Sequence, residues 1–191
     1  MVSIINTNYL IPEVKLFKLN RFNDNRGFFA ETFNREVYSK FGINSEFVQD
    51  NHSFSLKAGT VRGLHFQEPP HDQSKLVHCG KGMIFDVAVD LRKDSPTYSK
   101  WIGQELSYQN GFQLYIPSGF AHGFITLEPC SEIIYKCTNY YSPESERSVL
   151  WNDPDIGIKW PSTINKILNE RDAKAPLLKN IKSSFSRKLR S

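Results

Sequence analysis

Two histidines of this sequence follow a glycine at similar distances, and their side chains are the first candidates for chemistry. Five residues separate Gly59 from His65, and five separate Gly111 from the segment PSGFAH, which begins at Pro117 and ends at His122. An imidazole titrates near neutral pH, so it takes up and releases protons under working conditions, and its neutral form also binds metals. The spacing therefore indicates either acid–base catalysis or a metal site.

A phenol in a later segment is a third candidate. Residues 132–137, EIIYKC, alternate as a β-strand does, and Tyr135 shares a face with Ile133 and Cys137, opposite Glu132 and Lys136. A tyrosine on an apolar face is typical of a barrel interior, where it either packs in the core or donates its proton. The high pKa of an ordinary phenol suits the donor role.

Short alternating segments have to position these side chains. Residues 83–91, 113–116, 124–127 and 132–137 alternate as strands, with turn sequences at 94–96, 109–111, 117–119 and 142–143. Helix is predicted only over residues 34–41 and 163–169. Short strands at this spacing favour an antiparallel sandwich or barrel.

The two glycine–histidine spacings resemble the two motifs of the cupin superfamily, whose fold is a jelly roll, also called a double-stranded β-helix. The second motif, G-x5-P-x-G-x2-H, matches fully at residues 111–122. The first, G-x5-H-x-H followed by a glutamate, matches in outline, because Gln67 replaces its second histidine and Lys75 its glutamate. An amide and a cation at ligand positions oppose a divalent metal, so we expect a cupin pocket without a metal.

Further segments narrow the resemblance to one family. They read DNRGFFAE at 24–31, QDNHS at 49–53, VRGLHFQ at 61–67, GFAHGF at 119–124, YKCTNYYSPESE at 135–146, IGIKWP at 156–161 and RDAKAP at 171–176. In this order, over about residues 3–178, the chain resembles the dTDP-4-dehydrorhamnose 3,5-epimerases. The resemblance implies a mainly β, cupin-type jelly roll with a few short helices.

The family's reaction defines the roles that its residues would take here. Its substrate is dTDP-4-dehydro-6-deoxy-D-glucose, whose C4 ketone makes the protons on C3 and C5 abstractable. Loss of either proton gives an enolate, and reprotonation from the opposite face inverts the carbon, yielding dTDP-4-dehydro-L-rhamnose. This chemistry needs a base, an acid and groups that stabilise the enolate oxygen, but no cofactor. By resemblance, His65 is the base, Asp172 orients it and Tyr135 is the proton donor.

The resemblance also implies the residues that bind the substrate. Lys75 would serve the enolate oxygen or a phosphate, and His122 would hydrogen-bond the ketone or the sugar. The nucleotide and diphosphate would be bound by charges, amides and rings of Arg26, Phe29, Glu31, Gln49, Asn51, Arg62, Tyr140, Glu146 and Arg171. In the family, Arg26 and Glu31 lie on a segment that reaches the neighbouring subunit's site. A homodimer is therefore expected from the resemblance.

Composition argues for a cytoplasmic protein that binds neither nucleic acid nor membrane. The net charge is +4, but five of the 24 basic residues fall in residues 179–191, which hold no acidic residue and leave 19 basic against 20 acidic residues elsewhere. We interpret 1–178 as one domain and 179–191 as a solvated, partly disordered basic tail. No signal peptide is visible, no apolar run reaches the ~18 residues of a membrane span, and the three cysteines lack zinc spacing.

Other functions stay open at this stage. An epimerase that acts at C3 or C5 alone, or on a related nucleotide 4-keto-6-deoxy sugar, would use the same base and acid. A non-enzymatic sugar-nucleotide-binding cupin is disfavoured by the presence of His65, Tyr135 and Asp172. A metal-dependent cupin oxygenase is disfavoured by Gln67 and Lys75.

Overall fold

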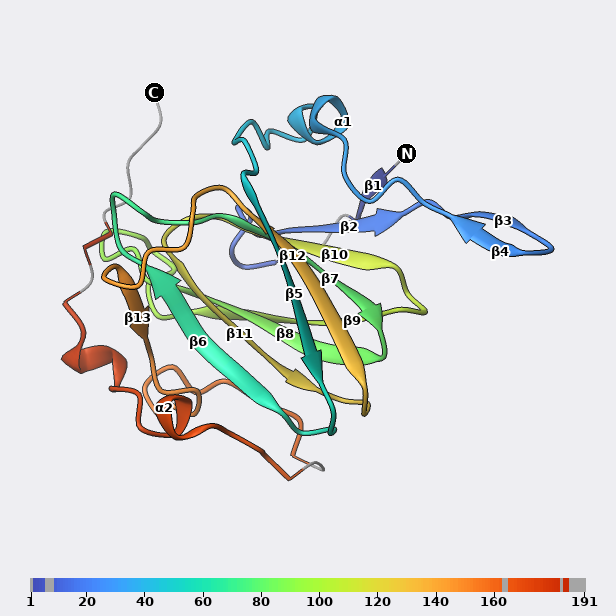
Figure 1. The fold of residues 1–191 in the computed structure, drawn as a ribbon. Helices are drawn as coiled ribbons and strands as arrows, with labels where there is room; N and C mark the ends of the chain where they lie inside the picture. Colours follow the sequence, from blue (N-terminus) through green and yellow to red (C-terminus); the bar gives the residue numbers. More distant parts are fainter. Residues whose placement is uncertain (1, 6–8, 163–164, 183, 186–191) are drawn as a thin grey trace.

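Two antiparallel sheets face each other and form the body of the molecule, and a two-stranded ribbon stands apart from them (Figure 1). The computed structural model describes residues 2–5, 9–162, 165–182 and 184–185. Within these ranges the sheets are built from strands that are mostly not consecutive in the chain. This arrangement confirms the predicted jelly roll.

The larger sheet has the strand order β1–β2–β10–β7–β12–β5. Its strands are β1 (Val2–Ile5), β2 (Lys15–Leu19), β10 (Phe112–Ile116), β7 (Lys75–Lys81), β12 (Ser131–Cys137) and β5 (Gln49–Ser55). The smaller sheet has the order β13–β6–β11–β8–β9. Its strands are β13 (Glu146–Ser148), β6 (Val61–Gln67), β11 (Phe120–Thr126), β8 (Met83–Asp90) and β9 (Trp101–Ser107).

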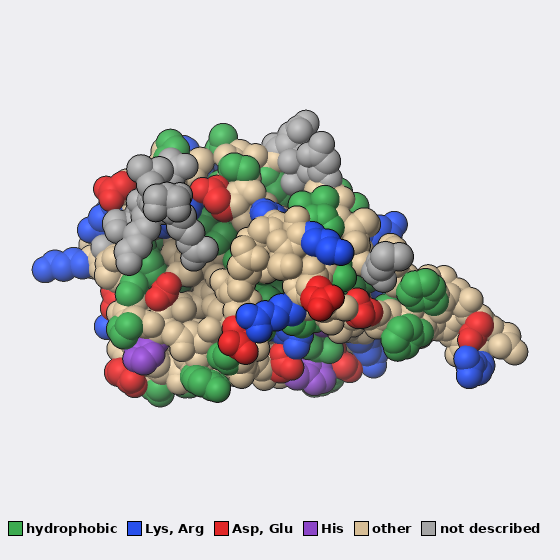
Figure 2. Space-filling view, turned by 90° about the horizontal axis from the view of Figure 1, so that it is seen from above, with side chains coloured by type: hydrophobic (Ala, Val, Ile, Leu, Met, Phe, Trp, Pro, Cys, Tyr) green, Lys and Arg blue, Asp and Glu red, His purple; other side chains and the backbone are tan. Residues whose placement is uncertain are grey.

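The ribbon consists of β3 (Phe22–Asp24) and β4 (Gly27–Phe29) and projects from the body next to β2 (Figure 1). Figure 2 shows it as a protrusion that carries hydrophobic side chains, and Phe22 and Phe29 are 56% and 70% exposed. The helix predicted over 34–41 is confirmed in shorter form as α1 (Arg35–Ser39), because the Asn34 side chain caps it by accepting from the Glu36 and Val37 amides.

The prediction of a helix over 163–169 is wrong for residues 165–169. Residues 163–164 lie outside the described residues, and residues 165–169 are not helical. Ile167 instead pairs with the start of β6: its amide donates to the Gly59 carbonyl at 2.8 Å, and its carbonyl accepts from the Val61 amide at 2.9 Å. These sheet-like bonds satisfy the backbone that a helix would have used. The short helices α2 (Glu170–Ala173) and η1 (Leu178–Asn180) follow.

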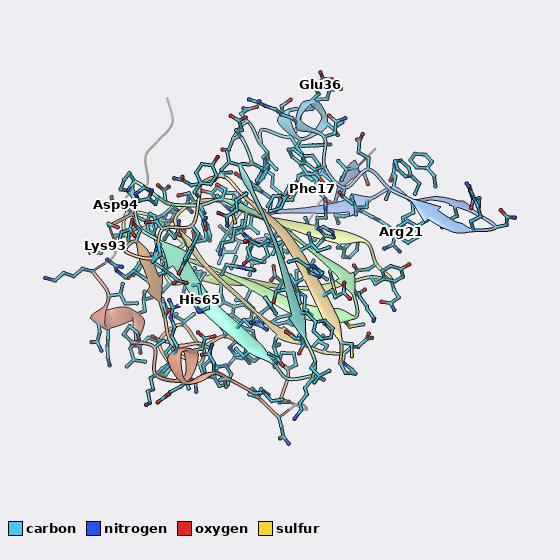
Figure 3. All side chains as sticks on the ribbon, viewed as in Figure 1. Phe17, Arg21, Glu36, His65, Lys93 and Asp94 are labelled. Atoms are coloured by element: carbon cyan, nitrogen blue, oxygen red, sulfur yellow. The ribbon has the colours of Figure 1, made fainter. Side chains whose placement is uncertain are left out.

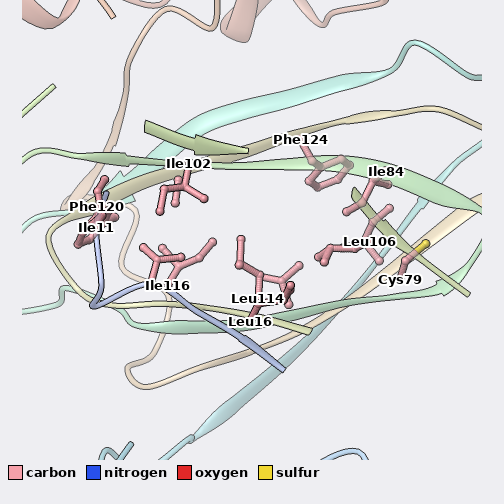
Figure 4. Packing of buried hydrophobic residues seen from close by; sticks show 14 residues of the cluster. Ile11, Leu16, Cys79, Ile84, Ile102, Leu106, Leu114, Ile116, Phe120 and Phe124 are labelled. Carbon is pink, nitrogen blue, oxygen red and sulfur yellow. The ribbon is translucent and has the colours of Figure 1, made fainter. Parts of the chain in front are cut away.

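Both faces of the smaller sheet are buried, which explains the pattern of β8. One face meets the larger sheet in a core that includes Ile84 and Ala88 (Figure 4). The other face lies under the C-terminal segment, where Val87 and Val89 pack with Leu178. The strictly apolar face of β8 is thus covered by the C-terminal segment, and the face that carries Asp86 points between the sheets.

The predicted tail starts as part of this packing. Phe185 is only 7% exposed and its ring packs against that of Phe66, with centroids 5.8 Å apart, while its carbonyl accepts from the Lys93 amide. The prediction of a solvated tail is therefore wrong for this residue, because burying an aromatic ring removes a large apolar area from water. Positions 183 and 186–191 of the predicted tail lie outside the described residues.

None of the helices in the described ranges has the length and apolar character that a bilayer-spanning helix requires. The thiols of Cys79, Cys130 and Cys137 are free.

Candidate active site

A close approach of two glycines brings both candidate histidines together. In the pairing of β6 with β11, His122 stands opposite His65, and Gly63 lies against Gly123. Gly63 has φ +120°, and a Cβ there would lie 2.6 Å from the Gly123 Cα and 2.7 Å from the His122 carbonyl oxygen. Only glycine fits this position. The strands can therefore place the two imidazoles side by side.

His65 is paired with a buried carboxylate from the other end of the chain. Its Nε2 lies 2.7 Å from Oδ1 of Asp172, whose side chain is 1% exposed, against 30% for His65. Oδ2 of the same carboxylate accepts from the Gly63 amide at 3.2 Å. Asn169 caps α2 by accepting from the Asp172 amide at 2.7 Å, which holds Asp172 in place. The predicted partnership of His65 and Asp172 is thus present as a hydrogen-bonded pair.

The surroundings of Asp172 favour its ionised form. Burial by itself raises the pKa of this carboxyl, but the hydrogen bond and charge of His65, the Gly63 amide and the nearby Arg171 together lower the pKa below its ordinary value. An ionised carboxylate on one ring nitrogen fixes the tautomer of His65 and stabilises the imidazolium that forms when His65 takes a proton. The pair can therefore act as a general base.

A second histidine–carboxylate pair lies deeper in the barrel and includes a residue that sequence reasoning missed. Nε2 of His122 lies 2.8 Å from Oδ1 of Asp86, and both side chains are buried. Burial lowers the pKa of His122, opposed by the Asp86 carboxylate. Oδ2 of Asp86 is buried without a hydrogen-bond partner among the described residues. The signal in the sequence that could have indicated this pair is Asp86, an acidic residue in the middle of the apolar strand MIFDVAVD.

Tyr135 reaches the same space from the larger sheet. Its ring centroid is 6.4 Å from that of His122, and Nζ of Lys75 lies 5.8 Å from the Tyr135 centroid. Burial raises the pKa of the Tyr135 phenol, so the hydroxyl keeps its proton at neutral pH. Burial lowers the pKa of Lys75, although the charges of Asp86 and Glu146 oppose this shift. A phenol and an amine therefore stand opposite the histidines.

A thiol is a further member of this interior face. Cys137 is the register partner of Lys75 across β12 and β7, and its Sγ accepts from Nδ2 of Asn51 at 3.5 Å. Burial raises the pKa of the Cys137 thiol, so it is protonated at neutral pH. Sequence reasoning assigned Cys137 no role, although it shares the strand face of Tyr135.

Four other predicted residues lie on β5, on β6 and on the loop after β12. On β5, Nε2 of Gln49 donates to Oδ1 of Asn51 at 3.1 Å, and Oε1 of Gln49 accepts from the Tyr141 amide at 2.9 Å. On β6, the exposed Arg62 donates to the Phe54 carbonyl at 3.0 Å. The side chain of Tyr140 is 65% exposed on the loop after β12.

Glu146 and Arg171 are joined by an ion pair of 2.7 Å, and Oε2 of Glu146 also accepts from the Tyr141 hydroxyl at 2.8 Å. Burial opposes ionisation of Glu146, but these two hydrogen bonds outweigh it and lower the pKa of the carboxyl. Because Arg171 precedes Asp172 on α2, the ion pair ties the strand β13 to the helix that carries the catalytic candidate.

Three predicted residues do not join this group within the same chain. Arg26 forms an ion pair of 2.6 Å with Asp24 at the tip of the ribbon, and Phe29 is exposed on β4. Glu31 accepts from Asn34 next to α1. Figure 3 labels His65 on β6 and Arg21 at the base of the ribbon, well apart in the body. The ribbon therefore points away from the His65 pair.

Gln67 replaces the second histidine of the first cupin motif, and its side-chain amide is hydrogen-bonded to backbone groups. Gln67 donates to the His71 and Tyr140 carbonyls and accepts from the Ser142 amide. Among the described residues, no group of three or more histidine, cysteine or acidic side chains is arranged to hold a metal ion. The side chains gathered here suit proton transfer next to a carbonyl group.

Comparison with known proteins gives a consistent result. A family model described as dTDP-4-dehydrorhamnose 3,5-epimerase matches residues 8–180. The dTDP-4-dehydrorhamnose 3,5-epimerase of Salmonella typhimurium is 51% identical over 179 residues, which cover 93% of this chain and 96% of that protein.

Two solved structures are similar over nearly the whole chain. A dTDP-4-dehydrorhamnose 3,5-epimerase from Bacillus anthracis with TDP and PPi bound has a TM-score of 0.87 and 47% identity, covering 93% of this chain and 99% of that one. A dTDP-6-deoxy-D-glucose-3,5-epimerase from Legionella pneumophila in complex with dTDP-4-keto-L-rhamnose has a TM-score of 0.90 and 46% identity, covering 95% of both chains.

Proposed function

The chain belongs to the dTDP-4-dehydrorhamnose 3,5-epimerase family, and on that premise we propose how its own residues perform the reaction. As a member it is an isomerase that converts dTDP-4-dehydro-6-deoxy-D-glucose into dTDP-4-dehydro-L-rhamnose. One observation carries the proposed mechanism: His65, which is bound to Asp172, and the Tyr135 phenol stand on the two facing sheets.

His65 is the proposed base for both carbons. Its side chain is the more exposed of the two imidazoles, and Asp172 on its Nε2 leaves Nδ1 as the nitrogen that receives the proton. The ionised Asp172 stabilises the resulting imidazolium without itself taking the proton. The C4 ketone accepts the electron pair and becomes the enolate oxygen.

Tyr135, Lys75 and His122 are proposed to act on the other side of the sugar. The Tyr135 hydroxyl keeps its proton until the enolate carbon accepts it, and delivery from the face opposite His65 inverts that carbon. Lys75 adjoins Tyr135 and offers a cation to the enolate oxygen, whereas His122, whose Nε2 faces Asp86, leaves Nδ1 to accept a hydrogen bond from a sugar hydroxyl. Water or bulk exchange then resets both groups for the second carbon.

We propose that the nucleotide half lies along Gln49, Asn51, Arg62, Tyr140 and the Glu146–Arg171 pair. Arg26, Phe29 and Glu31 are proposed to complete the site of a neighbouring subunit in a homodimer. The projecting ribbon supports this proposal, because its phenylalanines are exposed and its arginine has no partner beyond its own turn among the described residues. We also propose a cytoplasmic location, which the free thiols support.

Turnover in deuterated water tests the reaction and the number of inverted carbons. The enzyme should place solvent deuterium at both C3 and C5 of the product, because each inversion exchanges a carbon-bound proton for a solvent proton. Mass spectrometry and proton NMR of the sugar measure the positions. Deuterium at one carbon only would indicate the alternative, a single C3 or C5 epimerase, and absence of deuterium at both would contradict the proposed chemistry.

A further inference from the structure

Gln67 is the last residue of β6, and the hydrogen bonds of its side-chain amide use both N–H donors and one lone pair of the oxygen. Its side chain is 4% exposed. Nε2 donates to the His71 carbonyl at 2.5 Å and to the Tyr140 carbonyl at 3.1 Å, and Oε1 accepts from the Ser142 amide at 2.8 Å. Three backbone groups from two loops therefore converge on one buried side chain.

The two loops are residues 68–74, after β6, and residues 138–145, after β12. Gln73 adds a bond from its Nε2 to the Asn139 carbonyl at 2.7 Å, and Asn139 donates to the Pro70 carbonyl at 3.1 Å. These two bonds lie on more accessible side chains. Backbone bonds also join the loops, from the Thr138 amide to the Ser74 carbonyl at 3.1 Å and from the Glu68 amide to the Ser145 carbonyl at 2.9 Å. Gln67 adds three bonds from one buried side chain, and an unsatisfied buried amide is costly, so loss of these bonds should shift the loops more than loss of the outer side-chain bonds.

We propose that Gln67 is a positioning residue for nucleotide binding, because it fixes the loop 138–145 that carries Tyr140 and leads into Glu146. The proposal rests on the proposed function. On this loop the Tyr141 amide also donates to Gln49, and the Tyr141 hydroxyl to Glu146. A shift of the loop therefore moves several of the groups assigned to the nucleotide at once.

The hydrogen bonds that hold the proton-transfer pair come from outside this loop, although the Glu146–Arg171 ion pair links the end of the loop to α2. Asp172 is held by the Gly63 amide and by the Asn169 cap, and His65 lies on a strand that is paired on both sides. Loss of the Gln67 bonds should thus weaken nucleotide binding and leave the chemical step nearly intact. This separation distinguishes a positioning role from a general structural one.

Two variants of Gln67 test the proposal with dTDP as the probe. Gln67→Met is close in length and removes all three bonds, whereas Gln67→Glu keeps the acceptor for Ser142 and removes both donors. We expect the Kd for dTDP, measured by calorimetry, to rise about tenfold in either variant, and kcat for deuterium incorporation to stay within about threefold of wild type. Gln109→Met, at an exposed glutamine of the β9–β10 turn, is the control and should leave both quantities unchanged.

Amide hydrogen exchange distinguishes local loosening of the loop from a general loss of stability in a variant. The Ser142 amide and its neighbours in 138–145 should exchange faster in Gln67→Met, while amides of β8 and β11 keep their protection. Unchanged dTDP affinity would overturn the proposal, and so would a uniform rise in exchange with kcat falling as far as affinity. If wild-type protein fails to incorporate deuterium, the proposed function fails, whereas the loop exchange still reports on Gln67 separately.

Discussion

Two imidazoles of the site are each bound to a carboxylate, yet their surroundings differ. His65 is 30% exposed and paired at 2.7 Å with Asp172, whereas His122 is 7% exposed and paired at 2.8 Å with Asp86. The exposed imidazole can meet a substrate proton directly. Burial lowers the pKa of His122, which favours a neutral imidazole that donates from Nε2 to Asp86 and can accept through Nδ1. Similar pairs can thus serve different roles because their solvation differs.

Replacing Asp172, the buried carboxylate that pairs with His65, should remove most of the catalytic rate. In Asp172→Asn an amide faces Nε2 of His65, so the imidazolium loses its counter-charge and the tautomer is no longer fixed. We expect kcat to fall about 10²- to 10⁴-fold with dTDP affinity nearly unchanged. Steady-state kinetics and calorimetry measure the two effects. Asp94→Asn, at an exposed carboxylate, should match wild type, and retained turnover in Asp172→Asn would refute the pairing role.

The same substitution should change the pH dependence of stability. Because the pKa of Asp172 is lowered in the folded protein, its ionised form stabilises the fold above the unfolded value of about 4, and this contribution is lost as pH falls through the lower folded pKa. The difference in unfolding free energy between wild type and Asp172→Asn should therefore be largest near pH 7 and narrow below about pH 4. Denaturant titrations at several pH values measure it.

At the scale of the elements, the contact between β6 and β11 decides where the histidines lie. Gly63→Ala places a Cβ 2.6 Å from the Gly123 Cα at a φ of +120°, so the strands must separate or the backbone must change. We expect a loss of about 3 kcal/mol in stability together with a loss of turnover, because His65 and His122 move apart.

Gly157→Ala is a suitable control for that experiment. Gly157 also has a positive φ, +65°, but a Cβ added there would meet the Pro154 carbonyl oxygen first, at a distance of 3.7 Å. Gly157→Ala should lose only the smaller stability that a side chain costs at a positive φ, and the variant should keep its activity. Thermal unfolding and kcat distinguish the two variants. Equal effects at both glycines would show that close packing of the strands is unimportant.

At the scale of the whole molecule, the site of one chain lacks the ribbon residues that the family resemblance assigns to it. If the ribbon serves a partner, two inactive variants should complement each other in a mixed dimer. Co-expressed Arg26→Ala and His65→Ala chains form one intact site out of two per mixed dimer, so purified mixed dimers should regain about half of wild-type activity. Activity of the differently tagged, purified mixed dimers measures this recovery.

A matched pair of variants makes the complementation specific. His65→Ala and Asp172→Asn alter residues that lie in one site of one chain, so their mixed dimers hold no intact site and should stay inactive. Recovery of activity in this control pair would indicate that activity returns without the ribbon crossing between subunits. No recovery in the Arg26 and His65 pair would contradict the proposed crossing of the ribbon.

Sequence reasoning predicted the jelly roll and the family because ordered motifs and period-two alternation are local properties of the chain. It did not predict that Asp86 pairs with His122 or that Gln67 ties two loops, since partners come from other strands and loops. The helix predicted over 163–169 failed for its described part because β6 offered the Ile167 backbone better partners. Phe185 was assigned to the tail because the residues that pack against it, including Phe66, are distant in sequence.

The amino-acid sequence by itself determined the family, the reaction and the types of side chain available for proton transfer. Only the tertiary structure decided which groups meet: the 2.7 Å pair of His65 with Asp172, the phenol of Tyr135 on the facing sheet, and the separation of the ribbon from this site. The physical reason is that the type of side chain at each position is a property of the sequence alone. Distances, burial and pKa shifts instead arise when segments more than a hundred residues apart pack against each other.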